Sequence, residues 1–282
     1  MLEPKRAAIL GASGYTGAEL LRLLALHDGL RVDILTGTDR NAGKAFKEVF
    51  PQFSHRTDLP VLTTWEESQA EIEKCDVAFC CLPHGTTQEI IRTLATNAPS
   101  LKIVDLSADF RLFDTDTYAA WYGKEHTAKA LQEEAVYGLT ELNREKIKTA
   151  RVLANPGCYP TAAQLPLIPL LRAGLIESDD IIIDAKSGAT GAGRGAKEAF
   201  MFCEVADGIA AYGVASHRHA PEIEQGLGGA VGRDDVVVNF TPHLMPMSRG
   251  ILESIYVKVW FNPYSEPDPN YCHNHYPNQN QA

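Results

Sequence analysis

Residues 7–24 read AAILGASGYTGAELLRLL, which places a buried strand, a glycine turn and a helix in one short stretch. The apolar run 7–10 predicts the strand, and the leucines that follow predict a helix over 18–27. Gly11 and Gly14 allow a tight turn and a close approach to a pyrophosphate, while Gly17 allows the helix to pack closely on the strand. The helix is expected to bury Leu20, Leu21, Leu23 and Leu24. The stretch therefore predicts a dinucleotide-binding loop, with candidate contacts from Gly11, Ser13, Gly14, Tyr15, Thr16 and Gly17.

The segment after the second predicted strand, 30–35, bears on cofactor choice, because such folds bind the adenosine ribose there. Asp39 suits NAD, since a carboxylate at this place binds the ribose hydroxyls. Thr38, Arg40 and Lys44 instead offer a hydroxyl and two cations that would hold a 2′-phosphate. We favour NADP, and the alternative for Arg40 and Lys44 is a solvated loop.

Strands and helices continue to alternate along the first half of the chain. Residues 77–80 predict a strand before a helix over 87–94, and residues 102–105 predict the next strand. Such alternation predicts a parallel sheet, whose ligands bind at the carboxyl ends of the strands. The segments after these two strands are therefore expected to line the cofactor pocket, with Pro83 and Ser107 as candidate contacts.

Three other residues at these strand ends have two interpretations each. His84 either caps a helix or takes part in chemistry. Asp109 and Arg111 either form a structural ion pair or line the pocket, and Arg111 is a candidate substrate ligand. The run 114–116, Asp-Thr-Asp, predicts a helix start rather than a metal site.

Cys158 is the candidate nucleophile. It lies in Asn-Pro-Gly-Cys-Tyr-Pro-Thr, residues 155–161, after the apolar run 151–154 and before a helical pattern over 162–171. A helix N-terminus favours an anion, so the thiol is expected to ionise more easily than its unperturbed pKa of about 8.5 suggests. The alternative is a small buried hydrophobic residue, as many cysteines are.

Two segments of the second half carry further candidate site residues. The glycine-dense run 186–195 follows a strong strand at 181–185 and exposes N–H groups that suit an anionic substrate, although it also suits a flexible connector. Ser187 and Gly188 are its candidate substrate contacts.

The second segment is a histidine cluster, where His217 and His219 bracket Arg218. One histidine is expected to be the base that keeps Cys158 ionised, the other to be structural, and Arg218 to bind a carboxylate or phosphate. A zinc site is the competing interpretation, but the cluster lacks third and fourth ligands at a suitable spacing, so no metal is expected.

Composition narrows the class of protein. The chain has 282 residues, of which 45% are hydrophobic, enough for one large or two moderate domains. Its net charge of −10, without a Lys/Arg-rich block, argues against a nucleic-acid or anionic membrane partner. No apolar run reaches the roughly 20 residues that span a bilayer, the first six residues lack a signal-peptide core, and the six cysteines suggest reduced thiols. We therefore expect a cytoplasmic protein that acts on a small molecule.

From about residue 7 to 256 the motifs resemble one family, N-acetyl-gamma-glutamyl-phosphate reductase of arginine biosynthesis. The cofactor loop 11–20, the nucleophile segment 156–161, the glycine-rich loop 187–194 and the histidine segment 217–223 all look like those of the family. The resemblance implies a homo-oligomer, a dimer or tetramer. It also implies that Cys158 thiolate attacks N-acetyl-glutamyl phosphate, that NADPH reduces the resulting thioester to the semialdehyde, and that His217 is the acid/base partner.

Two rival functions remain. An aspartate-semialdehyde dehydrogenase or an aminoadipyl-phosphate reductase would share the thiolate, the histidine and NADPH. A truncated, non-catalytic nucleotide-binding protein is the rival from another class, and the unusual end of the chain supports it.

The expected organisation is α/β. A Rossmann-type NADP-binding domain over 1–157 is followed by an α+β catalytic domain of the semialdehyde-dehydrogenase type over 158–260 that is incomplete at its C-terminus. Residues 262–282 contain no Val, Ile, Leu, Met or Phe, so the end of the chain over 261–282 is expected to be a disordered tail. That tail resembles a frame-shifted or prematurely ended product.

Overall fold

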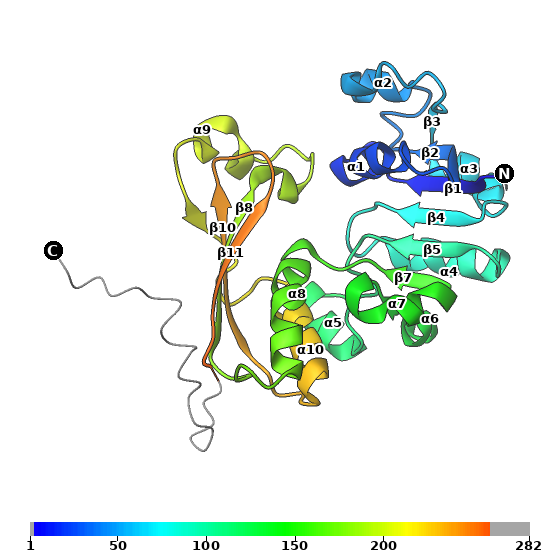
Figure 1. The fold of residues 1–282 in the computed structure, drawn as a ribbon. Coiled ribbons are helices and arrows are strands. Elements are labelled where there is room, and N and C mark those ends of the chain that lie inside the picture. Colours follow the sequence, from blue (N-terminus) through cyan, green and yellow to red (C-terminus); the bar gives the residue numbers. More distant parts are fainter. Residues whose placement is uncertain (1–2, 260–282) are drawn as a thin grey trace.

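A computed structural model describes residues 3–259, so the expectation about the tail 261–282 lies outside the described residues. Within that range the chain forms two sheets, each with its own helices (Figure 1). The first unit comprises residues 3–154 and holds a seven-stranded sheet of order β3-β2-β1-β4-β5-β7-β6. The second unit, residues 158–259, holds a four-stranded sheet of order β11-β8-β10-β9.

All paired strands of the first sheet run parallel, as the alternation of strands and helices predicts. Successive side chains of a strand point to opposite faces, so Ile9 joins the core beneath one helical layer while Ala8 and Leu10 join the core beneath the other. The strands are β1 (Lys5–Leu10), β2 (Leu30–Thr36), β3 (Leu62–Thr63), β4 (Val77–Cys80), β5 (Lys102–Asp105), β6 (Val136–Tyr137) and β7 (Val152–Ala154). The helices are α1 (Tyr15–Leu24), α2 (Phe46–Val49), α3 (Trp65–Ile72), α4 (Thr87–Asn97), α5 (Thr115–Tyr122), α6 (Lys129–Glu134) and α7 (Thr140–Thr149), with a 3₁₀ turn at Pro51–Phe53.

The first helix differs from its prediction at both ends. α1 begins at Tyr15 instead of residue 18 and ends at Leu24 instead of residue 27. Leu21 is buried as expected, but Leu23 is 57% exposed. The expectation for Leu23 is wrong because two residues turn a helix by roughly 200°, which carries this side chain to the opposite face from Leu21.

Within residues 158–259, two helices pack on one face of the second sheet. The helices α8 (Cys158–Arg172) and α10 (Ala220–Val231) pack on the strands β8 (Ile181–Gly188) and β10 (Val238–Met245), which run parallel. β11 (Ile251–Tyr256) and β9 (Ala210–Ala211) pair antiparallel at the two edges. Two 3₁₀ turns, Ala189–Ala192 and Glu198–Phe200, and the short helix α9 (Phe202–Val205) lie between β8 and β9.

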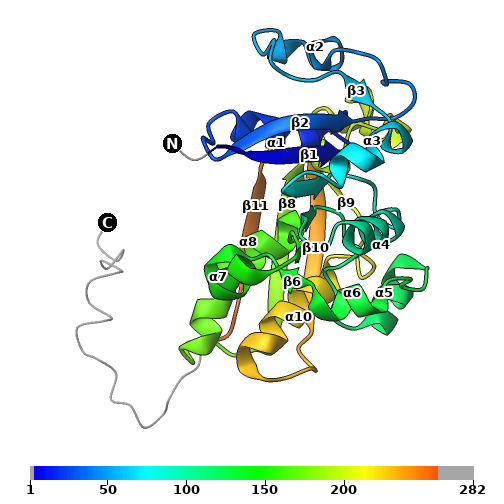
Figure 2. The ribbon, with the colours of Figure 1, turned by 90° about the vertical axis from the view of Figure 1, so that its right-hand side faces the viewer.

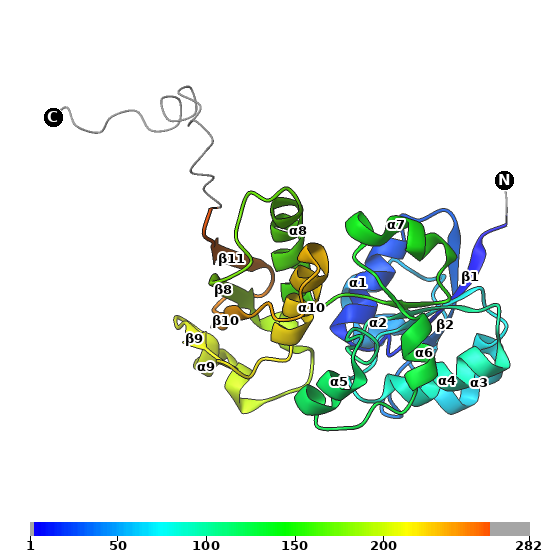
Figure 3. The same cartoon turned by 90° about the horizontal axis from the view of Figure 1, so that it is seen from below.

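The two helices α8 and α10 lie between the second sheet and the first unit (Figures 1 and 3). The helix-covered face buries Ile181 and Ile183, whereas the opposite face leaves Ile182 46% exposed. Leu252 and Tyr256 of β11 lie on that open face, because they pair with Lys186 and Ile182 in the register of the sheet. The open face therefore carries exposed apolar side chains.

Candidate active site

Cys158 is the first residue of α8 and follows the carboxyl end of β7 after the turn 155–157, so the predicted placement at a strand-to-helix turn is confirmed. The helix begins four residues earlier than predicted and contains Pro166 and Pro169. Gly157, its N-cap, has an extended backbone with φ −64° and ψ 155°. The N–H groups of the first helical turn have no partners inside the helix, and they lie beside the thiol.

The pKa of Cys158 moves opposite to the prediction. The residue reaches solvent, yet enough protein surrounds the thiol that burial is the largest influence and raises its pKa. Three groups lower the pKa, as predicted: the backbone N–H groups of Tyr159 and Cys158, and the nearby Arg111. Their effects on the pKa are smaller than that of burial. The prediction of an easily ionised thiol is therefore wrong for this structure, because burial outweighs the helix N-terminus.

Both histidines pack against the nucleophile segment. The His217 ring packs edge-on against Tyr159 at 5.5 Å and stands 4.9 Å from the His219 ring. His219 lies against Gly157 so closely that a Cβ on this glycine would be 2.7 Å from Nε2. The structure thus brings both histidines to the residues that flank Cys158.

Both histidines are neutral near pH 7. Burial, and then Arg218, lowers the pKa of His217 to about 4. Burial, and then Arg111, holds the pKa of His219 well below its usual range. The Nδ1 atom of His217 lies 3.1 Å from the backbone N–H of His219 and accepts its hydrogen bond, which places the proton of the neutral His217 ring on Nε2.

Glu222 is a site residue that the sequence analysis did not single out. It is 1% exposed, and its Oε1 accepts hydrogen bonds from Gly157 N and from the hydroxyl of Tyr137, both at 2.8 Å. Its Oε2 lies 3.6 Å from Arg111 Nη1. The sequence feature that could have identified Glu222 is its place as a carboxylate shortly after the two histidines.

Arg111 pairs with Glu222 and not with Asp109, so the structure corrects the proposed ion pair between Asp109 and Arg111. The Arg111 guanidinium also donates to the carbonyls of Asn155, at 2.8 Å, and Leu106, at 2.9 Å. Arg111 is 4% exposed, so it joins the loops after β5 and β7 from within the protein.

Asp109 holds the loop after β4. It accepts hydrogen bonds from Gly85 N at 2.6 Å, from Thr87 N at 3.0 Å and from the hydroxyl of Tyr118 at 2.9 Å. Ser107 donates through its hydroxyl to Asp105 at 2.8 Å. Ser107 is therefore a buried part of this network.

His84 is not a helix cap, since Thr86 occupies the N-cap of α4. Its Nδ1 accepts a hydrogen bond from Ala108 N at 2.9 Å, which joins the loops after β4 and β5. Burial, with Arg111 and Arg218 as smaller causes, lowers its pKa to about 4. His84 thus lies near the histidine cluster, since Arg218 is among the charges that shift its pKa.

The glycine loop has the close backbone approaches that its sequence predicts. Gly11 has φ +76°, and a Cβ there would lie 2.4 Å from the carbonyl oxygen of Cys81. A Cβ on Gly17 would lie 2.5 Å from Cα of Ala12. The loop also adjoins the end of β2, where a Cβ on Gly37 would lie 3.4 Å from the Ser13 hydroxyl. These positions fit a dinucleotide with its pyrophosphate at the start of α1 and its ribose near Gly37.

The candidate ribose residues Thr38, Asp39 and Arg40 are exposed, and Lys44 is partly buried.

Among the candidate substrate residues, Ser187 is buried and its hydroxyl donates to the Gly188 carbonyl at 3.1 Å. Arg218 is exposed, and its guanidinium carbon lies 5.2 Å from the centre of the Tyr122 ring of α5. Arg218 thus reaches from the second unit to the first.

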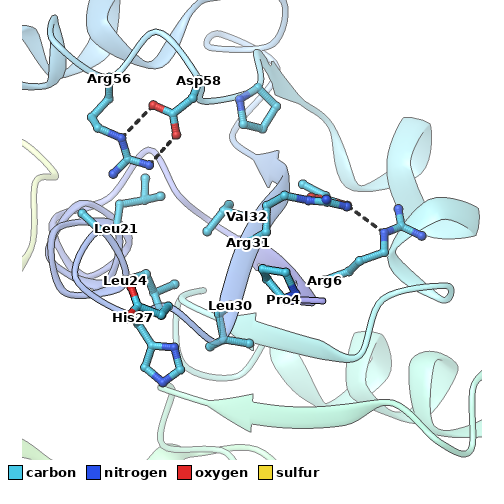
Figure 4. Close-up of a pocket in the computed structure, with 14 residues that line it drawn as sticks. Pro4, Arg6, Leu21, Leu24, His27, Leu30, Arg31, Val32, Arg56 and Asp58 are labelled. Carbon is cyan, nitrogen blue, oxygen red and sulfur yellow. Dashed lines mark hydrogen bonds and ion pairs between the residues drawn. The ribbon is translucent and has the colours of Figure 1, made fainter. Parts of the chain in front are cut away.

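A separate hollow of about 690 Å³ lies beside the amino ends of β1 and β2 (Figure 4). Arg6, His27, Leu30, Arg56 and Asp58 are among its lining residues. Ligands of parallel sheets bind at the opposite, carboxyl ends, so this hollow is not the dinucleotide site.

Within residues 3–259 no group of three or more His, Cys, Asp or Glu side chains is arranged to hold a metal ion, and no helix there is long and apolar enough to cross a membrane.

Two family models match the chain, one to each unit. Residues 6–150 match the NAD binding domain of semialdehyde dehydrogenase, and residues 158–279 match its dimerisation domain. Among solved structures, aspartate semialdehyde dehydrogenase II from Vibrio cholerae in complex with ASA has a TM-score of 0.66 at 14% identity. That match covers 92% of this chain and 75% of the other. Aspartate semialdehyde dehydrogenase with NADP from Candida albicans has a TM-score of 0.62 at 15% identity, with 93% and 74% covered. At these identities the likeness concerns the fold.

Curated relatives are far more similar in sequence. An N-acetyl-gamma-glutamyl-phosphate reductase of Rhodospirillum rubrum is 62% identical over 262 residues, which is 92% of this chain and 73% of the relative. A probable chloroplastic N-acetyl-gamma-glutamyl-phosphate reductase of Arabidopsis thaliana is 58% identical, over 90% of this chain and 61% of the relative. The chain belongs to the N-acetyl-gamma-glutamyl-phosphate reductase family, within the semialdehyde dehydrogenases.

Proposed function

We propose that the chain reduces N-acetyl-glutamyl 5-phosphate to N-acetylglutamate 5-semialdehyde and inorganic phosphate, a step of arginine biosynthesis, with NADPH as the reductant. The observation that carries the proposal is Cys158 at the start of α8, between Gly157, which His219 contacts, and Tyr159, which His217 contacts. Glu222 holds the same segment through the backbone N–H of Gly157. Family membership supplies the substrate class.

The chain's own residues account for the acyl transfer. The Cys158 thiol, which reaches solvent, releases its proton to water, and the resulting thiolate attacks the acyl carbon. The bond to the phosphate oxygen then breaks, so that a thioester and inorganic phosphate result. The N–H groups of the first turn of α8 are the donors for the oxyanion of the tetrahedral intermediate. When bound, NADPH supplies the hydride that reduces the thioester. The sulfur then leaves as thiolate, and its electron pair is stabilised by the proton on His217 Nε2.

Two arginines divide the charged roles. Arg111 is buried and occupied by two carbonyls and Glu222, which suits the alignment of the nucleophile loop. Arg218 is exposed between the two units, where it reaches the Tyr122 ring, so it is the better ligand for a carboxylate of the substrate. Ser187 and Gly188 complete the proposed substrate contacts from the glycine-rich loop.

We infer NADP over NAD from Thr38, Arg40 and Lys44, which follow the end of β2. Asp39 in the same loop is the residue that favours NAD. The remaining proposed cofactor contacts come from the glycine loop 11–17, from Pro83 and from Ser107. A cytoplasmic location agrees with the need of Cys158 to remain reduced.

The enzymatic test is oxidation of NADPH, followed by its absorbance, with N-acetyl-glutamyl, aspartyl and aminoadipyl phosphates as rival substrates. We expect a preference for the first, and loss of turnover without loss of NADPH binding in Cys158→Ser. A preference for either rival substrate would reject the substrate assignment. NADPH binding without turnover of any substrate by the intact chain would favour the non-catalytic rival.

We also infer that the chain forms a homodimer through the open face of the second sheet. Ile182, Leu252 and Tyr256 are 46%, 64% and 60% exposed there, and their unit matches a dimerisation domain. Lys186 and Asp184 form an ion pair at 2.5 Å on the same face. Exposed apolar side chains gathered on one face of a sheet mark an interaction surface.

Light scattering after gel filtration tests the dimer. Leu252→Asp should give monomers, because it places a charge within the contact. Leu23→Asp is the matched control, since Leu23 is 57% exposed on α1 of the first unit. A dimeric Leu252→Asp protein would place the contact elsewhere, and a tetramer would require a second surface.

A further inference from the structure

Two loops of the second unit reach the dinucleotide loop of the first unit. One is the glycine-rich loop after β8, residues 188–197, and the other is the turn 246–250 between β10 and β11. Backbone hydrogen bonds join them, from Ala189 N to Met247 O at 2.9 Å and from Thr190 N to Ser248 O at 3.0 Å. This end of the second sheet lies toward α1 in two perpendicular views (Figures 1 and 2). The two loops therefore form one arm that is anchored to the sheet at its base.

Arg194 is the residue of that arm that contacts the first unit most extensively. Its Nη1 donates to the carbonyl of Ser13 at 3.2 Å, and its Nη2 donates to the carbonyl of Val49 at 3.1 Å. Its guanidinium carbon lies 4.5 Å from the centre of the Phe50 ring, which is itself buried. A planar fork that donates twice and stacks on an aromatic ring uses features that only arginine combines.

The two carbonyls belong to different elements of the first unit. Ser13 lies in the loop directly before Gly14, the N-cap of α1, and Val49 ends α2. Arg194 thus spans the glycine loop and the segment after the ribose-binding residues. A dinucleotide bound at the start of α1 needs this loop in one conformation, because its backbone N–H groups meet the phosphates.

We propose that Arg194 is a cross-domain positioning residue that ties the substrate loop 188–197 to the dinucleotide loop at Ser13, so that cofactor binding and the placement of the substrate loop are coupled. The inference rests on one part of the proposed function, namely that a dinucleotide binds at loop 11–17. Coupling of this kind is reciprocal: if the bound dinucleotide favours the docked arm, the docked arm strengthens dinucleotide binding by the same factor. The docked arm also carries Ser187 and Gly188 at its base, next to the proposed substrate position.

A second cross-domain contact is weaker. Arg249 Nη1 lies 2.6 Å from Glu19 Oε1 of α1, but the two side chains are 64% and 36% exposed. Exposed ion pairs stabilise little, since water solvates both partners when they separate. Arg194 is exposed as well, but its guanidinium makes two hydrogen bonds and stacks on a buried ring, so it is the residue whose loss should uncouple the loops.

The test compares Arg194→Ala and Arg194→Lys with Lys197→Ala. Lys197 is the matched control because it lies in the same loop and its ammonium stands 5.9 Å from the ring of Phe200, within its own unit. The measurements are the Kd of NADPH from its fluorescence and the hydrogen exchange of residues 187–201 with and without NADPH. The rate of Cys158 alkylation and the melting temperature report whether the fold and the nucleophile are intact.

In the wild-type chain and in Lys197→Ala, we expect NADPH to slow exchange in residues 187–201. In Arg194→Ala this slowing should disappear and the Kd of NADPH should rise by about tenfold, as loss of charge-assisted hydrogen bonds implies. Arg194→Lys should fall between the two, because it keeps the charge but not the fork. The KM for the acyl phosphate should rise in Arg194→Ala more than kcat falls.

Two results would overturn the inference, and they are distinguishable from failure of the proposed function. If the wild-type chain binds NADPH and Arg194→Ala matches Lys197→Ala in Kd and exchange, the coupling is wrong while the cofactor assignment stands. If the wild-type chain does not bind NADPH at all, both the cofactor assignment and the coupling are wrong. If Arg194→Ala melts early, the same comparison is made with Arg194→Lys.

Discussion

The Oε1 atom of Glu222 accepts a hydrogen bond from the backbone N–H of Gly157 at 2.8 Å, so a carboxylate of α10 fixes the residue before the nucleophile. The same atom also accepts from the Tyr137 hydroxyl, and Arg111 faces the other oxygen. Residues from three separate parts of the sequence thus converge on one buried carboxylate. The position of Cys158 is therefore set by α10 as well as by its own helix.

Replacing Glu222 should destabilise the protein by an amount that depends on which of its hydrogen bonds and ion pairs the new side chain can still form. Glu222→Ala leaves Arg111 buried without its carboxylate, and we expect a loss of about 3 kcal/mol in the free energy of unfolding. Glu222→Gln retains an oxygen for Gly157 and should lose less. Urea unfolding measures both, and equal stability of Glu222→Ala and wild type would contradict the role assigned to this carboxylate.

The two glycines of the dinucleotide loop should differ in their tolerance of alanine. A Cβ on Gly17 would lie 2.5 Å from the backbone of Ala12, so α1 must move away from the loop. A Cβ on Gly14 meets only the carbonyl of Gly11, at an ordinary 3.5 Å. We expect Gly17→Ala to cost about 2 kcal/mol of stability by overpacking, and Gly14→Ala less than about 1 kcal/mol. Thermal unfolding of the two variants checks this, and a stable Gly17→Ala protein would show that the contact relaxes.

The two dinucleotides should respond differently to loss of Arg40. A 2′-phosphate that pairs with Arg40 is present only in NADPH, so Arg40→Ala should raise the Kd of NADPH by about tenfold and leave that of NADH nearly unchanged. Arg40→Lys should keep part of the preference. Titration of cofactor fluorescence measures all four constants. Equal losses for both cofactors would leave Arg40 as a solvated loop residue.

The pH dependence of Cys158 alkylation should show its raised pKa directly. Only the thiolate reacts, and burial raises the pKa of this thiol above its usual range, so the rate in the free protein should still increase above pH 9. Iodoacetamide labelling at Cys158, read by mass spectrometry of its peptide, gives the profile. A plateau below pH 8 would mean that the helix N-terminus outweighs burial after all.

The sequence predicted the parallel sheet and the place of Cys158 because both depend on local patterns. Apolar runs separated by amphipathic helices indicate β1, β4, β5 and their order along the chain without knowledge of distant contacts. The pKa of Cys158 could not be predicted in this way, because its main cause is burial, which only the folded chain provides. Glu222 was missed as a site residue for the same reason: its partners, Gly157, Tyr137 and Arg111, are far from it in sequence.

Glu253 should make stability depend on pH in a direction opposite to most carboxylates. Burial raises its pKa to about 7, and neither carboxylate oxygen has a hydrogen-bond partner within residues 3–259. A folded-state pKa above the unfolded value means that the carboxylate destabilises the fold once it ionises, so stability is lost as pH rises from about 4.5 to 7. Glu253→Gln should therefore stabilise the protein by roughly 2 kcal/mol at pH 8 and by nearly nothing at pH 4. Glu133→Gln, on an exposed carboxylate of α6, is the control. Urea unfolding at pH 4 and pH 8 measures the free energy of unfolding of each variant. If Glu253→Gln stabilises the protein equally at both pH values, the charge of Glu253 is not what destabilises the fold.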